Sequence, residues 1–182
     1  MRTTHIAPTG VERTFGEDEI IVSKTDLRGI ITYANDVFVR VSAYREDELL
    51  GRPHNIIRHP DMPRCVFKLL WSTVQDGREI FAYVVNLAAD GAHYWVLAHV
   101  TPSFSQSGEI IGYHSSRRCP RPRAVRTIAP VYAALCKEES KYSDPVQAMA
   151  ASAGLLGRTL ELEGLTYEQF VWDIIAKAED AA

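Results

Sequence analysis

The sequence predicts an α+β domain: a five-stranded antiparallel sheet with short helices on one face, followed by further helices. Three observations predict this class. Five runs rich in β-branched and aromatic residues occur in two groups instead of alternating with helices, as is typical of antiparallel sheets. Glycine-containing turn sequences separate runs within each group. Beyond residue 120, apolar residues recur at helical spacing.

The first group of strands is expected over residues 19–26 and 30–35, with a turn at Gly29 between them. Asn35, followed by aspartate, is a typical N-terminal cap, so a short helix is expected directly after the second strand. Acidic residues at the start of residues 45–51 and a glycine at their end indicate a second short helix.

The middle of the chain begins with residues 52–63, which contain three prolines and are expected to form no regular element. Pro63 suits the first turn of a helix over 64–74, and Gly77 follows as its stop. Three further strands are expected, with an Asp-Gly hairpin turn between the first two: 80–89, 92–104 and 110–118.

The region after the last strand is expected to be helical. Apolar residues at helical spacing over 125–135 predict one helix, with Thr127 as its cap so that Pro130 falls in its first turn. A second helix is expected to follow the cap residue Asp144 and to run to about Glu163.

The last helix follows Thr166 and Gln169, which have the spacing of a capping box. The polar start of the chain shows no period and is expected to be a mobile leader. The chain therefore divides into a flexible leader, a globular domain and a C-terminal helical extension: 1–17, 18–120 and 121–182.

Composition excludes several classes of function. Of the 182 residues, 46% are hydrophobic and 24% charged, as in ordinary globular proteins, and the formal net charge of −3 does not favour a binder of nucleic acid or anionic membranes. No apolar run is long enough for a membrane span or a signal peptide, so we expect a soluble, cytoplasmic protein. No common catalytic motif occurs, which favours a non-enzyme.

The three cysteines do not indicate a special site. Cys65, Cys119 and Cys136 are an odd number and lack CxxC spacing. This pattern favours neither a disulfide framework nor a thiolate zinc site, so reduced thiols are expected.

The most distinctive stretch lies within residues 52–63. Arg58 offers fixed donors, His59 a switchable donor or acceptor, and Asp61 an acceptor. Either Arg58 and Asp61 pair to hold a loop, or Arg58 binds an anionic or carbonyl-rich ligand while Asp61 accepts from a ring N–H or ribose hydroxyl. His54, His59 and Asp61 match no common metal spacing, so no metal site is expected.

Two histidines lie in the strand expected over 92–104. His93 and His99 have the same parity and share one face of the sheet, with Trp95 between them. They are either half-exposed strand residues or ligands of a non-covalently bound haem b, since no CxxCH attachment sequence occurs.

Four segments together resemble PAS domains, and more narrowly the FAD-binding PAS domains of aerotaxis receptors. They read YANDVFVRVSAY, PHNIIRHPDMP, DGAHYWV and IIGYHSSRR. The resemblance covers roughly residues 20–137, and the RHPDMP string is its most specific part. It implies a PAS fold with the five strands in the order 2-1-5-4-3, cupping a ligand under short helices.

The resemblance also implies a site. In the family, the Arg, His and Asp of RHPD support FAD binding, and two asparagines fall on Asn35 and Asn86. A carboxamide such as that of Asn86 can both donate to and accept from the polar edge of a flavin ring. The helix over 64–74 adds aromatic side chains. The expected cofactor-binding set is therefore Arg58, His59, Asp61, Asn35, Asn86, Trp71 and Phe67.

The sequence departs from the family in two places beside Asn86. Ile80 and Ala82 stand where the family often has Trp and Gly, and residues 87–89 (LAA) replace a basic stretch that could contact phosphates. The expected occupant of the pocket is still FAD, and the alternatives are a smaller flavin, haem, another small molecule or no ligand.

The function implied is that of a soluble redox or oxygen sensor that binds FAD and signals by contact, as in aerotaxis and chemotaxis. The expected partners are signalling proteins such as a chemoreceptor or a kinase. The alternatives are a cofactor-free scaffold or dimerisation module and a haem-based gas sensor. The C-terminal helices either form a homodimer or partner surface or fold back over the sheet, and the side chains in question are Leu155, Leu156, Phe170 and Trp172.

Overall fold

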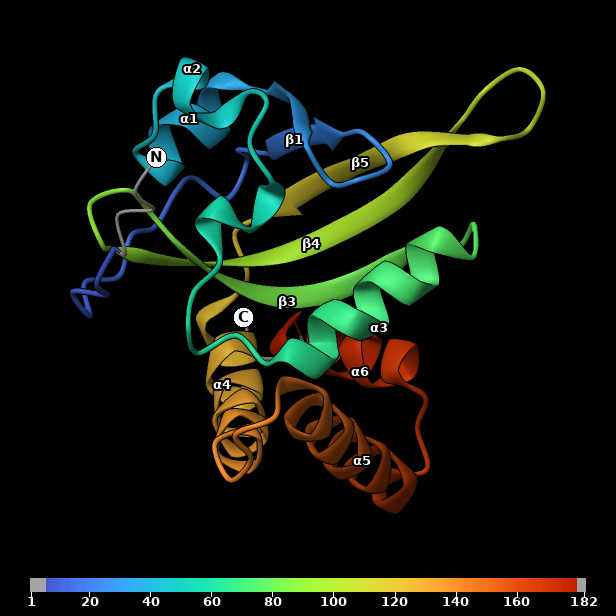
Figure 1. The fold of residues 1–182 in the computed structure, drawn as a ribbon. Coiled ribbons are helices and arrows are strands. Elements are labelled where there is room, and N and C mark those ends of the chain that lie inside the picture. The colour runs from blue at the N-terminus through green and yellow to red at the C-terminus, as the bar shows by residue number, and fades with distance from the viewer. Residues whose placement is uncertain (1–5, 180–182) are drawn as a thin grey trace.

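The computed structural model describes residues 6–179 and contains a five-stranded sheet in the order β2-β1-β5-β4-β3 (Figure 1). All neighbouring strands are antiparallel, which confirms the predicted fold class and strand order. The strands are β1 (Ile21–Thr25), β2 (Ile31–Ala34), β3 (Ile80–Leu87), β4 (His93–Phe104) and β5 (Ile110–Arg118).

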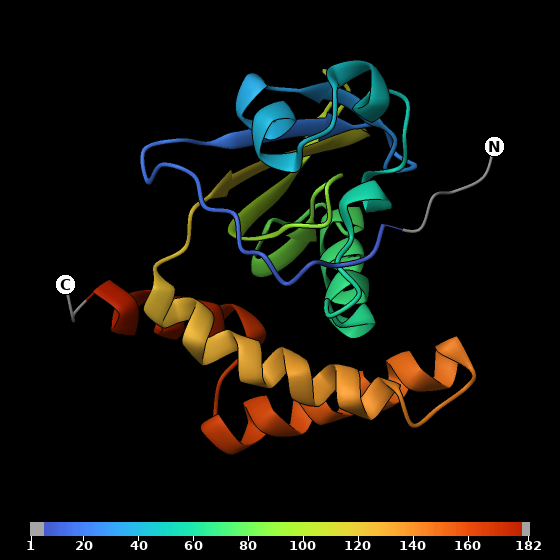
Figure 2. The same ribbon diagram turned by 90° about the vertical axis from the view of Figure 1, so that its left-hand side faces the viewer.

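The helices form two groups around the sheet. Those of the domain lie on one face: α1 (Asp36–Ser42), α2 (Glu46–Leu49), the single 3₁₀ turn η1 (His54–Ile57) and α3 (Arg64–Gln75). The C-terminal helices form a separate layer beyond β3, as Figure 2 shows: α4 (Pro122–Glu139), α5 (Pro145–Glu163) and α6 (Tyr167–Glu179).

Side-chain caps account for three helix starts, as the sequence predicts. The Asn35 side chain accepts a hydrogen bond from a backbone amide of α1, and that of Asp144 accepts two from α5. At α6, Gln169 Oε1 accepts from the Thr166 amide at 2.8 Å, while Thr166 Oγ1 accepts from the Gln169 amide at 3.2 Å. These bonds satisfy amides that a helix start leaves without partners.

Two predicted elements were wrong. The proline-rich residues 52–63 do contain a regular turn. The 3₁₀ turn η1 lies between Pro53 and Pro60, so neither proline interrupts it. Helix α4 starts at Pro122 instead of after Thr127, so Pro130 lies inside the helix. A proline at the first helical position costs no hydrogen bond, and the added first turn buries Ala124, which favours the longer helix despite the interior proline.

The start of the chain contacts the sheet, whereas the sequence predicts a mobile leader over 1–17. Residues 1–5 of that leader lie outside the described residues. The Thr9 amide donates to Gly91 O at 2.8 Å, the Arg13 amide donates to His93 O at 2.7 Å, and Phe15 is buried. Gly91 has a φ of +85°, and a Cβ there would lie 2.5 Å from a backbone oxygen of the leader. Only glycine therefore permits this close approach.

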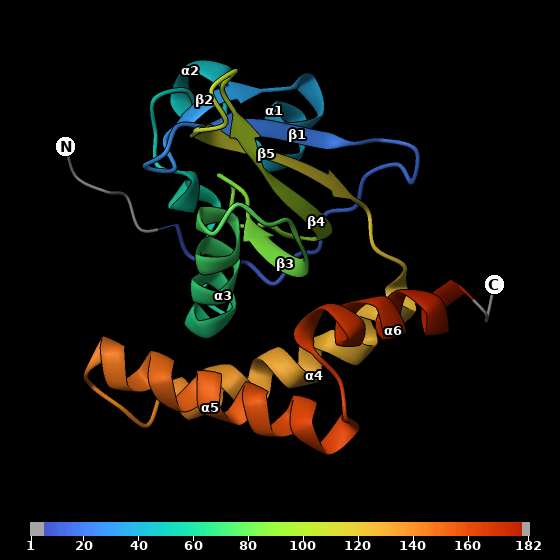
Figure 3. The ribbon, with the colours of Figure 1, turned by 90° about the vertical axis from the view of Figure 1, so that its right-hand side faces the viewer.

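The C-terminal helices pack against the outer face of β3 and β4, opposite the domain's own helices. The Tyr132 hydroxyl of α4 donates to Tyr83 O of β3 at 2.7 Å, and the Tyr132 ring lies 6.1 Å from that of Trp95. Figure 3 shows α6 beside β3 as well, where the Trp172 and Phe81 rings lie 4.9 Å apart. The helical extension thus adds a third layer to the domain.

The side chains expected at a dimer surface are mostly used in this packing. Leu156 is buried, and Leu155 and Phe170 are half-buried against the hydrophobic core. Trp172 alone of the four is exposed, by 46%. A homodimer through these helices stays a prediction. Within residues 6–179, no helix has the length and apolar character needed to cross a membrane.

Candidate functional site

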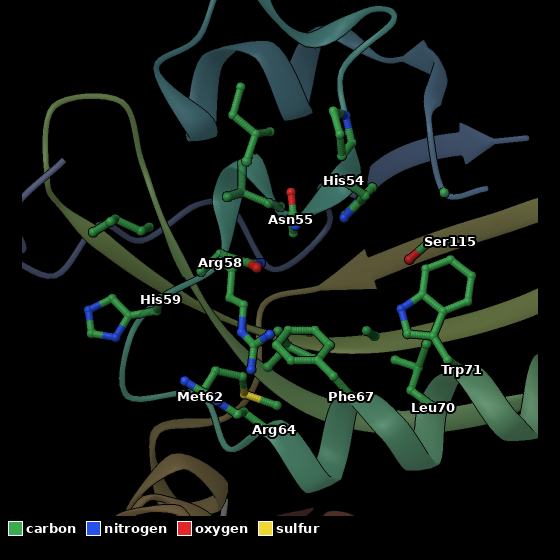
Figure 4. A pocket seen from close by; sticks show the side chains of 18 of the residues that line it. His54, Asn55, Arg58, His59, Met62, Arg64, Phe67, Leu70, Trp71 and Ser115 are labelled. Carbon is green, nitrogen blue, oxygen red and sulfur yellow. The ribbon is translucent and has the colours of Figure 1, made fainter. Parts of the chain in front are cut away.

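A cavity of about 1470 Å³ lies between the sheet, η1 and α3. Small-molecule pockets commonly measure roughly 300–1,000 Å³, so this one has room for a large ligand. Its walls come from inward-facing residues of β3, β4 and β5, from the segment after η1, and from the cavity face of α3 (Figure 4). Residues of α5 complete its outer end.

The sheet side of the cavity carries polar atoms that form no hydrogen bond with any residue the structure describes. Strand alternation brings Asn86 of β3 and Ser115 and Arg117 of β5 to the same face, and Thr25 of β1 joins them. All four are cavity-lining residues, and each has a buried side-chain atom without a hydrogen-bond partner within residues 6–179: Thr25 Oγ1, Asn86 Nδ2, Ser115 Oγ and Arg117 Nη1. Buried polar atoms are rarely left unpaired, so this wall fits a polar ligand.

Arg117 is the centre of a small polar cluster. Its Nη2 donates to Ser23 Oγ and to His54 Nε2, both at 2.6 Å, and Ser23 Oγ lies 3.1 Å from the same His54 nitrogen. The guanidinium carbon lies 5.1 Å from the centre of the Phe38 ring, and the His54 ring stacks on that ring at 5.9 Å. Only 3% of Arg117 is exposed, and among the described residues no carboxylate pairs with it.

The surroundings of His54 and Arg117 determine the charge of both side chains at neutral pH. Burial, and then the nearby Arg117 guanidinium, lowers the pKa of His54 to about 3. Burial lowers the pKa of Arg117 to about 10. His54 is therefore neutral and accepts through Nε2, while Arg117 stays cationic. A lone buried cation on a cavity wall favours an anionic or carbonyl-rich ligand.

The lowered pKa of His54 predicts a pH dependence of stability in the ligand-free protein. The unfolded chain takes up this proton near pH 6.5 and the folded chain only near pH 3, so stability is full above pH 6.5 and is lost as pH falls toward 3. Between pH 7 and pH 5, the wild type should lose about 2 kcal/mol more unfolding free energy than His54→Asn. Urea unfolding at both pH values measures this, and parallel losses in the two proteins would contradict it.

The helical wall of the cavity carries three of the sequence-predicted residues. The Arg58 guanidinium lies 4.6 Å from the centre of the Phe67 ring, and Trp71 packs edge-on against Tyr113 at 5.3 Å. Figure 4 shows the Phe67 and Trp71 rings on the same side of α3, one turn apart. Arg58 also forms a β-bridge with Asn86, which joins the two walls.

His59 lies at the margin of the cavity. Its ring turns away from Arg58 and lies 5.9 Å from that of His93, and its Nδ1 accepts from the Asp61 amide at 3.1 Å (Figure 4). Burial lowers the pKa of His59, so its neutral form is favoured. His59 therefore holds the loop that carries Arg58.

Two predicted residues lie away from the cavity. The Asn35 side chain uses its oxygen to accept from the Val22 and Phe38 amides and its nitrogen to donate to Ile20 O. Its capping role leaves little capacity for a ligand. The Asp61 side chain is 84% exposed, and among the described residues no ion pair joins it to Arg58. A tight turn at Pro60 directs this carboxylate to solvent.

Sequence reasoning missed His54, Ser115 and Arg117 as parts of the site. Arg117 could have been identified from the alternation of residues along β5. This alternation places Arg117 on the buried face of the strand, where an arginine needs a partner. His54 carried no such signal, since only the long-range contact with Arg117 identifies its role.

The strand histidines considered for haem binding lie on the other face of the sheet. His99 stacks on Phe81 at 4.1 Å and pairs with Glu79 at 2.7 Å, while the neighbouring Ala98 lines the cavity. His93 has the same parity as His99. Neither therefore points into the cavity as a haem ligand would.

Comparisons with known proteins agree with this architecture. The chain is 39% identical to the aerotaxis receptor of Escherichia coli K12 over 133 residues, 73% of this chain and 26% of that protein. It is 30% identical to a nitrogen fixation regulatory protein of Klebsiella pneumoniae over 99 residues, 54% of this chain and 20% of that one. The chain thus spans about a quarter or less of the length of these relatives.

Solved structures show the same fold at lower identity. The dark-state LOV domain of the blue-light photoreceptor Aureochrome1 is similar with a TM-score of 0.53 and 22% identity, over 67% of this chain and 86% of that one. A PAS domain from Colwellia psychrerythraea has a TM-score of 0.51 and 20% identity, over 55% of this chain and 85% of that one. The family model of the PAS fold matches residues 17–115. This chain therefore belongs to the PAS family.

Proposed function

We propose that the cavity binds FAD and that the protein is a cytoplasmic redox or oxygen sensor, acting by contact on a chemoreceptor or kinase and not as an enzyme. The observation that carries the proposal is the set of unpartnered polar atoms on the cavity wall, at Asn86, Ser115 and Arg117. The similarity to an aerotaxis receptor supports the sensory class.

The residues present fit a flavin ring. The ring has a polar edge of nitrogen and carbonyl groups, which the free donors of Asn86 and Arg117 can bind. Its two faces are flat and apolar, and Phe67 and Trp71 offer aromatic surface on the helical wall. A bound flavin supplies reversible reduction, with a proton gained at its N5 atom.

The same residues connect the ring position to the rest of the protein. Asn86 can change from donor to acceptor by turning its amide, so it can follow a change of proton at the ligand. Arg117 is bonded to Ser23 of β1, and Phe67 lies on α3, whose first amides bond to Glu139 of α4. These contacts lead from the cavity wall to the sheet on one side and to the C-terminal helices on the other.

The experiment is a visible absorption spectrum of the purified protein, with mass analysis of any released ligand. We expect the bands of an oxidised flavin, their loss on chemical reduction, and FAD in the released fraction. A colourless protein that takes up neither FAD nor other flavins would overturn the proposal and favour the cofactor-free scaffold. An intense Soret band would instead indicate haem.

A further inference from the structure

The outer end of the cavity lies between the PAS domain and helix α5. Pro145, Val146 and Met149 of α5 line it on one side. Ser152 of the same helix donates to Glu139 Oε1 at 2.8 Å, and Glu139 accepts from the first amides of α3. The α5 wall is therefore tied to the helix that carries Phe67 and Trp71, and its position is defined by hydrogen bonds.

The opposite wall of this outer end carries three cations. Arg64 and Lys68 lie one turn apart on the cavity face of α3, and Arg58 lies beside them over Phe67. Among residues 6–179, no carboxylate pairs with Arg58 or Lys68, and Arg64 Nε lies 3.9 Å from Glu139 Oε2. Burial, and then Arg64, lowers the pKa of Arg58, as expected for crowded like charges.

Glu139 is the carboxylate that faces these cations. Its oxygens already accept from two backbone amides and from Ser152, and its side chain is 11% exposed. The strip formed by Arg58, Arg64 and Lys68 therefore carries a net positive charge, because the carboxylate facing it already accepts other hydrogen bonds. Such a strip binds phosphate oxygens well, because guanidinium and ammonium groups form charge-assisted hydrogen bonds with them.

We propose, building on the FAD proposal above, that this outer end binds the phosphate and adenosine half of the dinucleotide. The phosphates lie on Arg58, Arg64 and Lys68, and the adenine lies against the apolar surface of Val146 and Met149. Val146 is 69% exposed although it is a large apolar residue, and a methionine adapts well to a flat ring. These cations take the place of the basic stretch that residues 87–89 lack.

The consequence is that α5 forms part of the ligand site. A ring held by Asn86 and Arg117 needs only the inner end of the cavity, whereas the second half of a dinucleotide reaches α5. A shorter flavin without the second nucleotide leaves that helix uncontacted. The C-terminal extension therefore selects for FAD over riboflavin.

The experiment measures dissociation constants of FAD and riboflavin for the full chain freed of ligand, by fluorescence titration. The variants are Lys68→Glu and Val146→Glu. Their matched controls are Lys137→Glu, an exposed lysine of α4 away from the cavity, and Leu162→Glu, 88% exposed on α5. We expect each variant to weaken FAD binding about tenfold or more and riboflavin binding by less than about threefold, with both controls unchanged.

Equal loss of both ligands in a variant, or no loss of FAD in either, would overturn the assignment of the outer end while leaving the FAD proposal intact. A wild-type protein that binds neither ligand would overturn both. The two failures are therefore distinguished by the wild-type titration alone.

Discussion

Replacing Arg117 with methionine is expected to abolish binding of the proposed flavin and, in the same protein, to raise the stability of the ligand-free state. The guanidinium is 3% exposed, has no carboxylate partner among the described residues and leaves Nη1 unbonded. Removing a buried charge that a bound ligand uses should cost about 2–5 kcal/mol of binding free energy, which is about 30-fold or more in affinity.

The stability of the ligand-free protein is expected to rise, although the affinity falls, because the Arg117 guanidinium is buried and no carboxylate within residues 6–179 pairs with it. Methionine keeps the unbranched apolar stem and removes the unpaired charge, and apolar replacement of buried charged groups often stabilises a protein. Ser23 Oγ and His54 Nε2 lie 3.1 Å apart and can bond to each other once the guanidinium is gone. We expect a gain of about 1–2 kcal/mol in unfolding free energy, measured by urea unfolding of the ligand-free protein.

The neighbouring residue provides the control. Arg118 is exposed on the opposite face of β5, so Arg118→Met should change neither quantity appreciably. If Arg117→Met lowers stability as well as affinity, Arg117 is a structural residue and its link to a ligand fails. An unchanged affinity would remove Arg117 from the binding site.

The fold was largely predictable because its elements have local causes. Strand β5 has the predicted bounds, and α5 begins and ends at the residues that its cap and its terminal glycine indicate. The start of α4 was not predictable in the same way. Two prolines in one segment offer two first-turn positions, and the burial of Ala124 in the added first turn favours the longer helix.

The site was predictable only in part. A motif or a helical stripe marks Arg58, Phe67 and Trp71 in the sequence, and in the structure all three line the cavity, while their binding of a cofactor stays a prediction. Asn35 shows the limit, since one amide can serve as a cap or as a ligand contact and its sequence position fits both. Arg117 and His54 lie 63 residues apart, and no local pattern predicts such a pair.

Glu139→Ala is expected to release the C-terminal helices from α3 and expose a buried thiol. Helix α3 has Pro63 as its cap residue, without a side-chain hydrogen bond, so Glu139 supplies the missing acceptor: it binds the Arg64 amide at 2.8 Å and the Cys65 amide at 3.3 Å. It also accepts from Ser152. Losing a helix cap and a half-buried hydrogen bond together should cost about 2–3 kcal/mol of unfolding free energy.

The thiol of Cys65 reports this release, because it is 3% exposed beneath α4 and α5. Its alkylation requires local opening, and each 1.4 kcal/mol of lost local stability raises the rate about tenfold. Mass analysis of the labelled peptides separates Cys65 from Cys119 and Cys136. The neighbour Glu138→Ala is the control, since the Glu138 side chain bonds to Lys141 of its own segment and not to α3, and this variant should leave the rate unchanged. If Cys65 of Glu139→Ala reacts at the wild-type rate, other contacts hold the C-terminal helices against α3 and Glu139 does not couple them.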